Sequence, residues 1–148
     1  MNGISNGNVL HGRTAIITGG SQGLGLKIAM QYVAAGASVI ICARDEGMLS
    51  EAADVLKRSA SNDQVISHIV ADVAESASVG ALIDFAIDRM GRIDILVNNA
   101  GFYGPIGPTD SVDWAQWVQA INFNLLGSVL MCRAIVGFEV KGPELLKE

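Results

Sequence analysis

The residues with the clearest capacity for chemistry form the stretch Thr18–Gly25, which reads Thr-Gly-Gly-Ser-Gln-Gly-Leu-Gly. It follows a short apolar run, Thr14–Thr18, and precedes apolar residues at helical spacing. Glycines let a backbone turn sharply and approach a ligand closely, and the free N–H groups of a helix start bind phosphate. Such a stretch can also be a plain turn, but its place between a strand and a helix favours a phosphate-binding turn.

Two further groups of polar residues follow apolar runs. Asn98, Asn99, Ala100 and Gly101 come after the run Ile93–Val97. Another run ends in Ala-Arg-Asp at positions 43 to 45. A carboxylate at such a strand tip binds an adenosine 2′-hydroxyl, whereas an arginine suits a 2′-phosphate. The aspartate has a simpler alternative role as a helix cap, which stabilises a helix by about 1 kcal/mol.

The elements that must position these residues alternate along the chain. Short β-branched runs are separated by segments whose apolar residues recur at helical spacing, which predicts strands joined by helices. Such alternation predicts a parallel sheet with helices on both faces. The expected class is α/β, a doubly wound sheet of the Rossmann type with about four strands in the order 3-2-1-4. The predicted strands are Thr14–Thr18, Ala37–Ala43, Val65–Ala71 and Ile93–Val97.

The remainder of the chain is expected to form a loop and one long helix. Glycines and prolines disfavour regular structure between Gly101 and Asp110. Asp110 or Ser111 can then cap a helix over residues 111–136. The stretch Ala120–Phe138 is apolar, but two asparagines and an arginine interrupt it, so we expect a buried helix and no membrane span.

Composition narrows the class of protein. The net charge of -5 argues against nucleic acid and anionic membranes as partners, because both attract clustered Lys and Arg. Residues 1–12 are a polar lead-in without the features of a secretory signal. The two cysteines, Cys42 and Cys132, lie in apolar runs and are predicted to be small core residues, which fits a cytoplasmic setting. No metal site is expected.

The glycine spacing Gly-x-x-x-Gly-x-Gly, combined with Asn-Asn-Ala-Gly after the fourth strand, resembles the short-chain dehydrogenase/reductase family. Asp72-Val73 after the third strand and Asn124-Leu125-Leu126-Gly127, seven residues after Trp117, extend the resemblance. It covers about residues 13–136 and implies an NAD(P)(H)-dependent oxidoreductase of an alcohol or carbonyl. The residues that it places at the cofactor are Gly19, Ser21, Gln22, Gly23, Leu24, Gly25, Arg44, Asp72, Val73, Asn99, Ala100 and Gly101.

The resemblance also bears on cofactor choice and on a relay residue. In the family, the acidic residue that selects NAD stands at the position of Ala43, so Arg44 favours NADP over NAD. Asn124 resembles the catalytic relay asparagine, whose backbone carbonyl holds a water. A helix-bending polar residue is the alternative role for Asn124, and Asn122 is the second candidate for the relay.

The family's proton donor is a Tyr followed four residues later by a Lys, assisted by a Ser. The two tyrosines, Tyr32 and Tyr103, are followed at that distance by Gly36 and Gly107. Residues 137–148 also depart from the family pattern. We therefore expect a C-terminally truncated chain that is inactive alone, with an unpaired fourth strand that promotes self-association.

Two alternatives remain open at this point. One is a non-catalytic dinucleotide-binding module that forms a homo-oligomer or pairs with a full-length relative through the helix over residues 111–136. The other is a chain without a stable fold.

Overall fold

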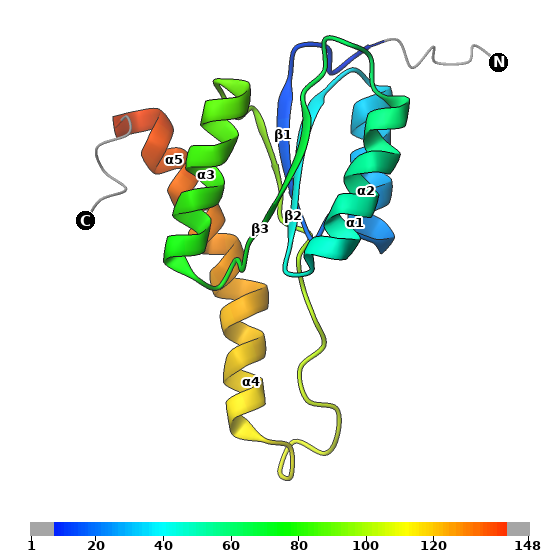
Figure 1. Ribbon diagram of the computed structural model, residues 1–148. Helices are drawn as coiled ribbons and strands as arrows, with labels where there is room; N and C mark the ends of the chain where they lie inside the picture. The colour runs from blue at the N-terminus through cyan, green and yellow to red at the C-terminus, as the bar shows by residue number, and fades with distance from the viewer. Residues whose placement is uncertain (1–7, 142–148) are drawn as a thin grey trace, which may run out of the picture.

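A computed structural model describes residues 8–141, and these form one four-stranded parallel sheet (Figure 1). The strand order is β3-β2-β1-β4, as the sequence predicts. In the centre of the sheet Ile16 pairs with Ile40 on one side and Leu96 on the other. The strands are β1 (Thr14–Thr18), β2 (Ser38–Ala43), β3 (Ile66–Val70) and β4 (Ile95–Val97).

Helices cover both faces of the sheet, which confirms the doubly wound α/β class. The helices α1 (Gly23–Ala34) and α2 (Glu46–Ser59) lie on one face, and α3 (Ser76–Met90) and α5 (Gly127–Lys141) lie on the other (Figure 1). Two further segments precede α5: α4 (Trp114–Ile121) and a π-helical turn, η1 (Asn122–Leu126). The helix α5 continues past residue 136, where the sequence suggested the end of the domain.

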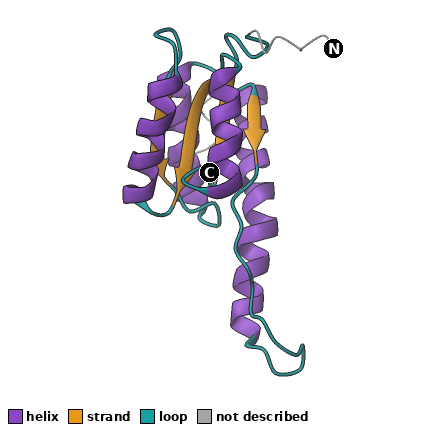
Figure 2. Cartoon of the chain, turned by 90° about the vertical axis from the view of Figure 1, so that its right-hand side faces the viewer, coloured by secondary structure: helices purple, strands orange, loops and turns teal. Residues whose placement is uncertain are grey.

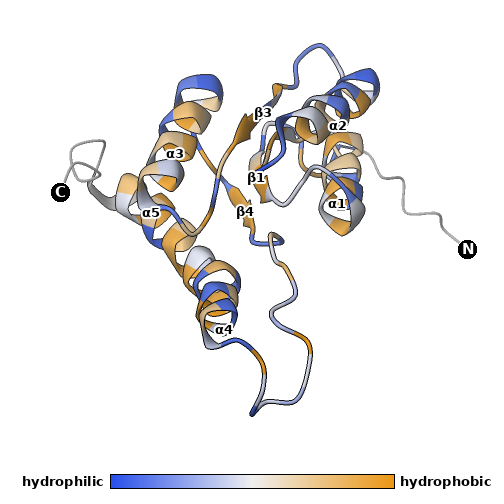
Figure 3. Cartoon of the chain, turned by 60° about the horizontal axis from the view of Figure 1, so that its bottom comes forward, coloured by the Kyte–Doolittle hydropathy of each residue, from blue (hydrophilic) through white to orange (hydrophobic). Residues whose placement is uncertain are grey.

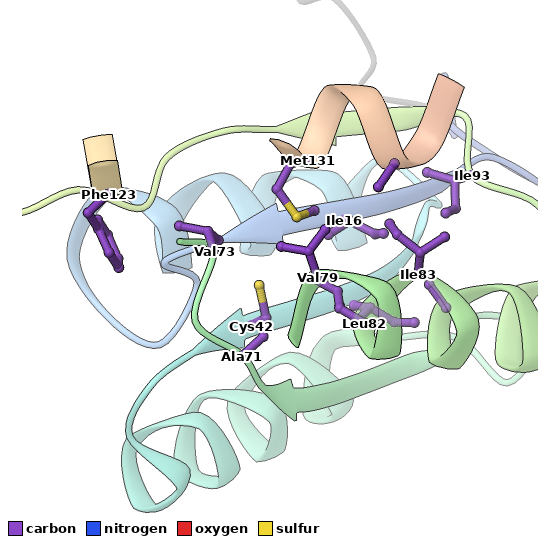
Figure 4. Close-up of a cluster of buried hydrophobic side chains, with 13 residues drawn as sticks. Ile16, Cys42, Ala71, Val73, Val79, Leu82, Ile83, Ile93, Phe123 and Met131 are labelled. Atoms are coloured by element: carbon purple, nitrogen blue, oxygen red, sulfur yellow. The ribbon is translucent and has the colours of Figure 1, made fainter. Parts of the chain in front are cut away.

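Alternation along the strands separates two hydrophobic clusters. Successive strand side chains point to opposite faces, so Ile16 and Ile40 join one cluster while Ile17 and Ile41 join the other. All four are fully buried. Both faces of each central strand are therefore apolar. The strand ribbons that are labelled in Figure 3 are accordingly coloured mainly as hydrophobic. In the first cluster Met131 of α5 points toward the sheet beside residues of α3 (Figure 4).

Helix ends follow local side-chain chemistry. The carboxylate of Asp45 accepts a hydrogen bond of 2.8 Å from the Met48 amide, so its predicted capping role is confirmed. Gly91 ends α3 with a left-handed φ of 74°. The predicted cap of the long helix is wrong: Asp113 caps α4 by accepting from the Gln116 amide at 2.8 Å, and Asp110 and Ser111 lie in the preceding turn.

Asp94 joins β1 to β4 at the edge of the sheet opposite the glycine-rich turn. Its carboxylate accepts hydrogen bonds from the Thr14 amide at 2.9 Å and the Thr14 hydroxyl at 3.1 Å. Arg13 and Arg92 pair with the same carboxylate, whose side chain is 7% exposed. Burial alone raises the pKa of Asp94, but these hydrogen bonds outweigh burial and hold the pKa below its ordinary value.

The segment α4-η1-α5 is less buried than the sequence analysis predicted. Trp114, Ile121 and Leu125 are exposed, because α4 and the loop before it extend away from the sheet (Figure 2). The stretch Trp114–Phe138 is long and apolar enough to cross a membrane, with 28% of its most apolar window buried. One such helix is weak support for a membrane span, since core helices of soluble proteins meet the same criteria. The prediction of a buried helix is wrong for α4 and only partly right for α5.

Candidate functional site

The described cavity that collects most of the predicted residues lies at the carboxyl ends of β1, β2 and β4. Its volume is about 370 Å³. In an open α/β sheet, ligands bind outside the carboxyl ends of the strands. They bind at the point where the connections from two neighbouring strands lead to opposite sides of the sheet. The predicted residues that line it are Gly19, Ser21, Gln22, Leu24, Gly25, Arg44, Val73, Asn99, Ala100 and Gly101.

Thr18 and Asn99 join the glycine-rich turn to the Asn-Asn-Ala-Gly segment. Thr18 is buried, with 1% of the residue exposed. Its hydroxyl accepts hydrogen bonds from the backbone amides of Asn99 at 3.1 Å and Ala100 at 3.0 Å. In return, the side-chain amide of Asn99 donates to the carbonyl oxygens of Thr18 at 3.0 Å and Gly19 at 3.1 Å. Thr18 and Asn99 therefore fix the cavity floor together. The sequence analysis did not predict this role for either of the two residues.

Close packing explains two of the glycines. A Cβ atom on Gly25 would lie 2.2 Å from the Gly19 carbonyl oxygen and 2.5 Å from the side-chain nitrogen, Nδ2, of Asn99. Gly19 itself has a φ of +65°, and a Cβ atom there would lie 2.9 Å from the Cα atom of Ala100. Only glycine fits at these positions, and the turn is thereby drawn against the start of α1.

The N-terminus of α1 offers unused hydrogen-bond donors to the cavity. Its first turn contains no acidic residue, and the side chain of the N-cap residue Gln22 makes no capping hydrogen bond. The first amides of a helix have no partner within the helix and carry a partial positive charge. Ser21, Gln22 and Leu24 line the cavity beside these amides, so this end suits an anion such as a phosphate.

Arg44 places a positive charge at the opposite end of the cavity. Its guanidinium carbon lies 4.9 Å from the ring centre of Phe123 and 5.8 Å from that of Phe102. The two rings pack edge to face at 5.2 Å. No ion pair of Arg44 is found within residues 8–141, so the charge is available to an anionic ligand.

Asn124 lies in the π-helical turn and holds the loop after Gly101. Its side chain accepts a hydrogen bond from the Phe102 amide at 3.0 Å and donates to the Phe102 carbonyl at 2.9 Å. Its backbone carbonyl accepts a hydrogen bond from the Ser128 hydroxyl at 3.2 Å. π-Helical turns are frequent at functional sites, and in this one the side chain of Asn124 holds the loop that borders the cavity.

Some predicted residues lie outside this cavity. Gly23 supplies a positive φ of 56° at the start of α1 but is not a lining residue. Asp72 and Asn122 line a neighbouring cavity of about 640 Å³ between the segment that precedes α3 and the long helix. The Asp72 carboxylate there accepts a hydrogen bond from the Ala74 amide at 2.9 Å. Tyr103 is 91% exposed and lines none of the described cavities.

Sequence reasoning missed several lining residues. They are Cys42, Met48, Ala71 and Phe123. The place of Cys42 and Ala71 at strand ends was the available signal, whereas nothing in the sequence pattern distinguished Phe123. Burial raises the pKa of Cys42 to about 12, so it is an apolar wall residue and not a nucleophile. The prediction of a core position is right for Cys42 and wrong for the exposed Cys132.

Comparison with known proteins assigns the family. Residues 13–142 match the family model described as short chain dehydrogenase. A short-chain dehydrogenase/reductase of Saponaria officinalis is 40% identical over 110 residues, covering 74% of this chain and 35% of that protein. A putative ketoacyl reductase of the granaticin polyketide synthase from Streptomyces violaceoruber is 36% identical, covering 82% of this chain and 43% of that protein.

The fold is shared with solved structures of the same family. A variant of actinorhodin polyketide ketoreductase, solved with NADPH, superposes with a TM-score of 0.79 at 28% identity. The alignment covers 86% of this chain and 48% of that structure, so the chain spans less than half of each of these three proteins. From the family match, the sheet order and the residues around the cavity, the chain belongs to the short-chain dehydrogenase/reductase family.

Proposed function

We propose that the cavity at the carboxyl end of the sheet binds a nicotinamide dinucleotide, as the cofactor part of an oxidoreductase of alcohols or carbonyls. The observation that carries the proposal is the Thr18–Asn99 connection, which places the N-terminus of α1 and the Asn-Asn-Ala-Gly segment around one cavity. A phosphate site and a second binding segment on one floor suit an elongated ligand with a pyrophosphate centre.

The residues present fit this cofactor. The unpaired amides at the start of α1, beside Ser21 and Gln22, would hold the pyrophosphate. Ala100 and Gly101 would lie along the nicotinamide end, and Val73 and Asp72 along the adenine end. A bound nicotinamide supplies or accepts a hydride, and the chain's own residues fix its position and exclude water from the cavity floor.

Arg44 favours the phosphorylated cofactor, NADP. Its guanidinium stands at the tip of β2 without an acidic partner among the described residues, and a planar guanidinium binds phosphate with two parallel hydrogen bonds. Asp45 lines the same cavity, and we propose that its main role is the cap of α2 that one of its carboxylate oxygens provides. The NADPH of the related ketoreductase structure supports the same choice.

The proton transfer that accompanies hydride transfer requires an acid, and the sequence contains no Tyr-x-x-x-Lys. We propose that this chain supplies the cofactor site and the relay position at Asn124, and that the acid of the complete enzyme lies outside these 148 residues. Asn124 would act through its backbone carbonyl, whose lone pairs are shared with the Ser128 hydroxyl. Activity in the 148-residue chain alone is not expected.

The exposed apolar side of α4 and α5 is proposed as a contact surface between copies of the chain. Trp117, Ile121, Leu125 and Val129 are each at least 39% exposed on this segment. A contiguous apolar surface of this kind marks an association site.

Two free thiols, with no disulfide among the described residues, support a reducing compartment such as the cytoplasm.

Thermal unfolding of the chain with NADPH and with NADH tests the proposed function. A ligand that binds only the native state raises its melting temperature, by an amount that grows with ligand concentration over Kd. We expect a larger rise with NADPH than with NADH. In the Arg44→Gln variant the difference between the cofactors should disappear, while a rise with NADH should remain. Absence of any rise with either cofactor in the wild-type chain would refute cofactor binding.

A further inference from the structure

The cavity described above and its larger neighbour share two lining residues, Arg44 and Phe123. The first cavity extends from these residues toward the glycine-rich turn, and the second extends toward the segment before α3 and toward α4. Val73 lines the first cavity and Asp72 the second, although the two are adjacent in the chain. The guanidinium of Arg44, 4.9 Å above the Phe123 ring, therefore stands in the wall between the cavities.

The two members of this wall differ in burial. Phe123 is 7% exposed, packs edge to face against Phe102, and lies at one end of the first hydrophobic cluster (Figure 4). Arg44 is exposed and comes from the strand tip on the other side of the opening. A cation above an aromatic ring is held by a modest attraction, which a stronger partner such as phosphate overcomes.

We propose that Phe123 is a positioning residue that holds Arg44 across the adenosine end of the cavity in the free protein. This inference rests on the proposed function, because the displacing ligand is the adenosine half of the dinucleotide. Binding of adenosine lifts the guanidinium from the ring and joins the two cavities, so the purine can lie beside the Asp72-Val73 segment. A 2′-phosphate then receives the released guanidinium, whereas an unphosphorylated ribose leaves it without a partner.

Arg44 makes two contributions to the affinity for an adenosine ligand, and variants of Arg44 and Phe123 can separate them. Releasing Arg44 from the ring costs the same for every adenosine ligand, and pairing with phosphate benefits only the phosphorylated ones. Removing the ring should therefore tighten all adenosine ligands by a similar factor. Removing the guanidinium should tighten adenosine 5′-phosphate and weaken adenosine 2′,5′-bisphosphate. Nicotinamide mononucleotide, which occupies the other end, should respond to neither change.

Calorimetric titration of the 148-residue chain with these three nucleotides tests the inference. In Phe123→Leu, both adenosine ligands should bind roughly two- to five-fold more tightly, the fold-change that corresponds to about 0.5–1 kcal/mol. In the Arg44→Gln background, Phe123→Leu should produce no such tightening, and Phe123→Tyr, which keeps the ring, should match the wild type. A purely packing role of Phe123 would instead give the same change in both backgrounds.

A measurement that needs no variant guards against misfolding of Phe123→Leu. The δ-methylene protons of Arg44 should resonate upfield in the free chain because of the ring beneath them, and should return downfield with adenosine 2′,5′-bisphosphate. Ordinary shifts in the free chain, or unchanged Kd values in Phe123→Leu, would overturn the inference while nucleotide binding stands. Failure of all three nucleotides to bind the wild-type chain would overturn the proposed function, and this inference with it.

Discussion

Thr18 and Asn99 each bind the other's backbone across the ends of two neighbouring strands. The Thr18 hydroxyl accepts a hydrogen bond from the Asn99 amide at 3.1 Å, and the Asn99 side chain donates to the Thr18 carbonyl at 3.0 Å. The residues are 81 positions apart in sequence. This pairing converts two separate motifs into one cavity floor, and the geometry of the proposed cofactor site depends on it.

Replacement of Asn99 should therefore damage both stability and binding. Asn99→Ala removes two hydrogen bonds to the carbonyls of Thr18 and Gly19, so we expect a loss of about 1–3 kcal/mol in unfolding free energy. Urea unfolding measures this loss. Asn98→Ala is the matched control, because the exposed side-chain amide of Asn98 contacts the Ser128 carbonyl at 3.5 Å and the Cys132 sulfur at 3.4 Å, away from the glycine-rich turn. Equal losses in the two variants would show that the Thr18–Asn99 pairing is not the important one.

Two glycines should respond in opposite directions to the same substitution. In Gly25→Ala the new methyl group meets the Gly19 carbonyl at 2.2 Å, so a loss of about 1–3 kcal/mol and weaker NADPH binding are expected. Gly80 in α3 has open space where a methyl group would lie, and Gly80→Ala should gain about 0.5–1 kcal/mol from helix propensity. Chemical denaturation distinguishes them, and a loss in both variants would contradict the close-packing role of Gly25.

The sequence predicted the sheet well because buried parallel strands are apolar on both faces and are bounded by glycines. The order of strands and the helices on both faces follow from right-handed crossovers. The cap at Asp113 could not be chosen over Asp110 or Ser111, since all three residue types cap helices and lie within a few positions of one another.

The site was predicted in outline but not in its contacts. Spacing identified Asn99 and Arg44 as site residues, but long-range partners such as Thr18 and Phe123 are set by tertiary packing. The exposure of α4 and of Cys132 had the same origin. A periodic apolar face indicates that one side of a helix packs against other residues. It does not reveal whether those residues belong to the described part of this chain.

Stability should fall in acid through Asp94. Because hydrogen bonds hold its folded-state pKa below the unfolded value of about 3.9, its contribution is complete at neutral pH and is lost as pH falls through the folded-state pKa. Asp94→Asn should lower the unfolding free energy by about 1–3 kcal/mol at pH 7. The difference from wild type should shrink below about pH 4. A difference that does not change with pH would assign the effect to packing instead of charge.

The apolar side of the long helix should cause association of the chain. Leu125 is 58% exposed, and Leu125→Glu should lower the apparent mass in sedimentation experiments, because a buried unpaired carboxylate opposes contact between copies. Val9 is 73% exposed but lies far from this segment in sequence, so Val9→Glu serves as the control. A monomeric wild-type chain, or an equal effect of both substitutions, would argue against this surface.

Our central proposal is that the cavity at the ends of β1, β2 and β4 binds the nicotinamide dinucleotide. Backbone amide chemical shifts of the isotope-labelled chain, recorded during titration with NADPH, test this claim most directly. We predict the largest changes at Ser21–Gly25, at Arg44 and at Asn99–Gly101, with little change along α3. Absence of changes in these three segments, or changes confined to α4 and α5, would contradict it.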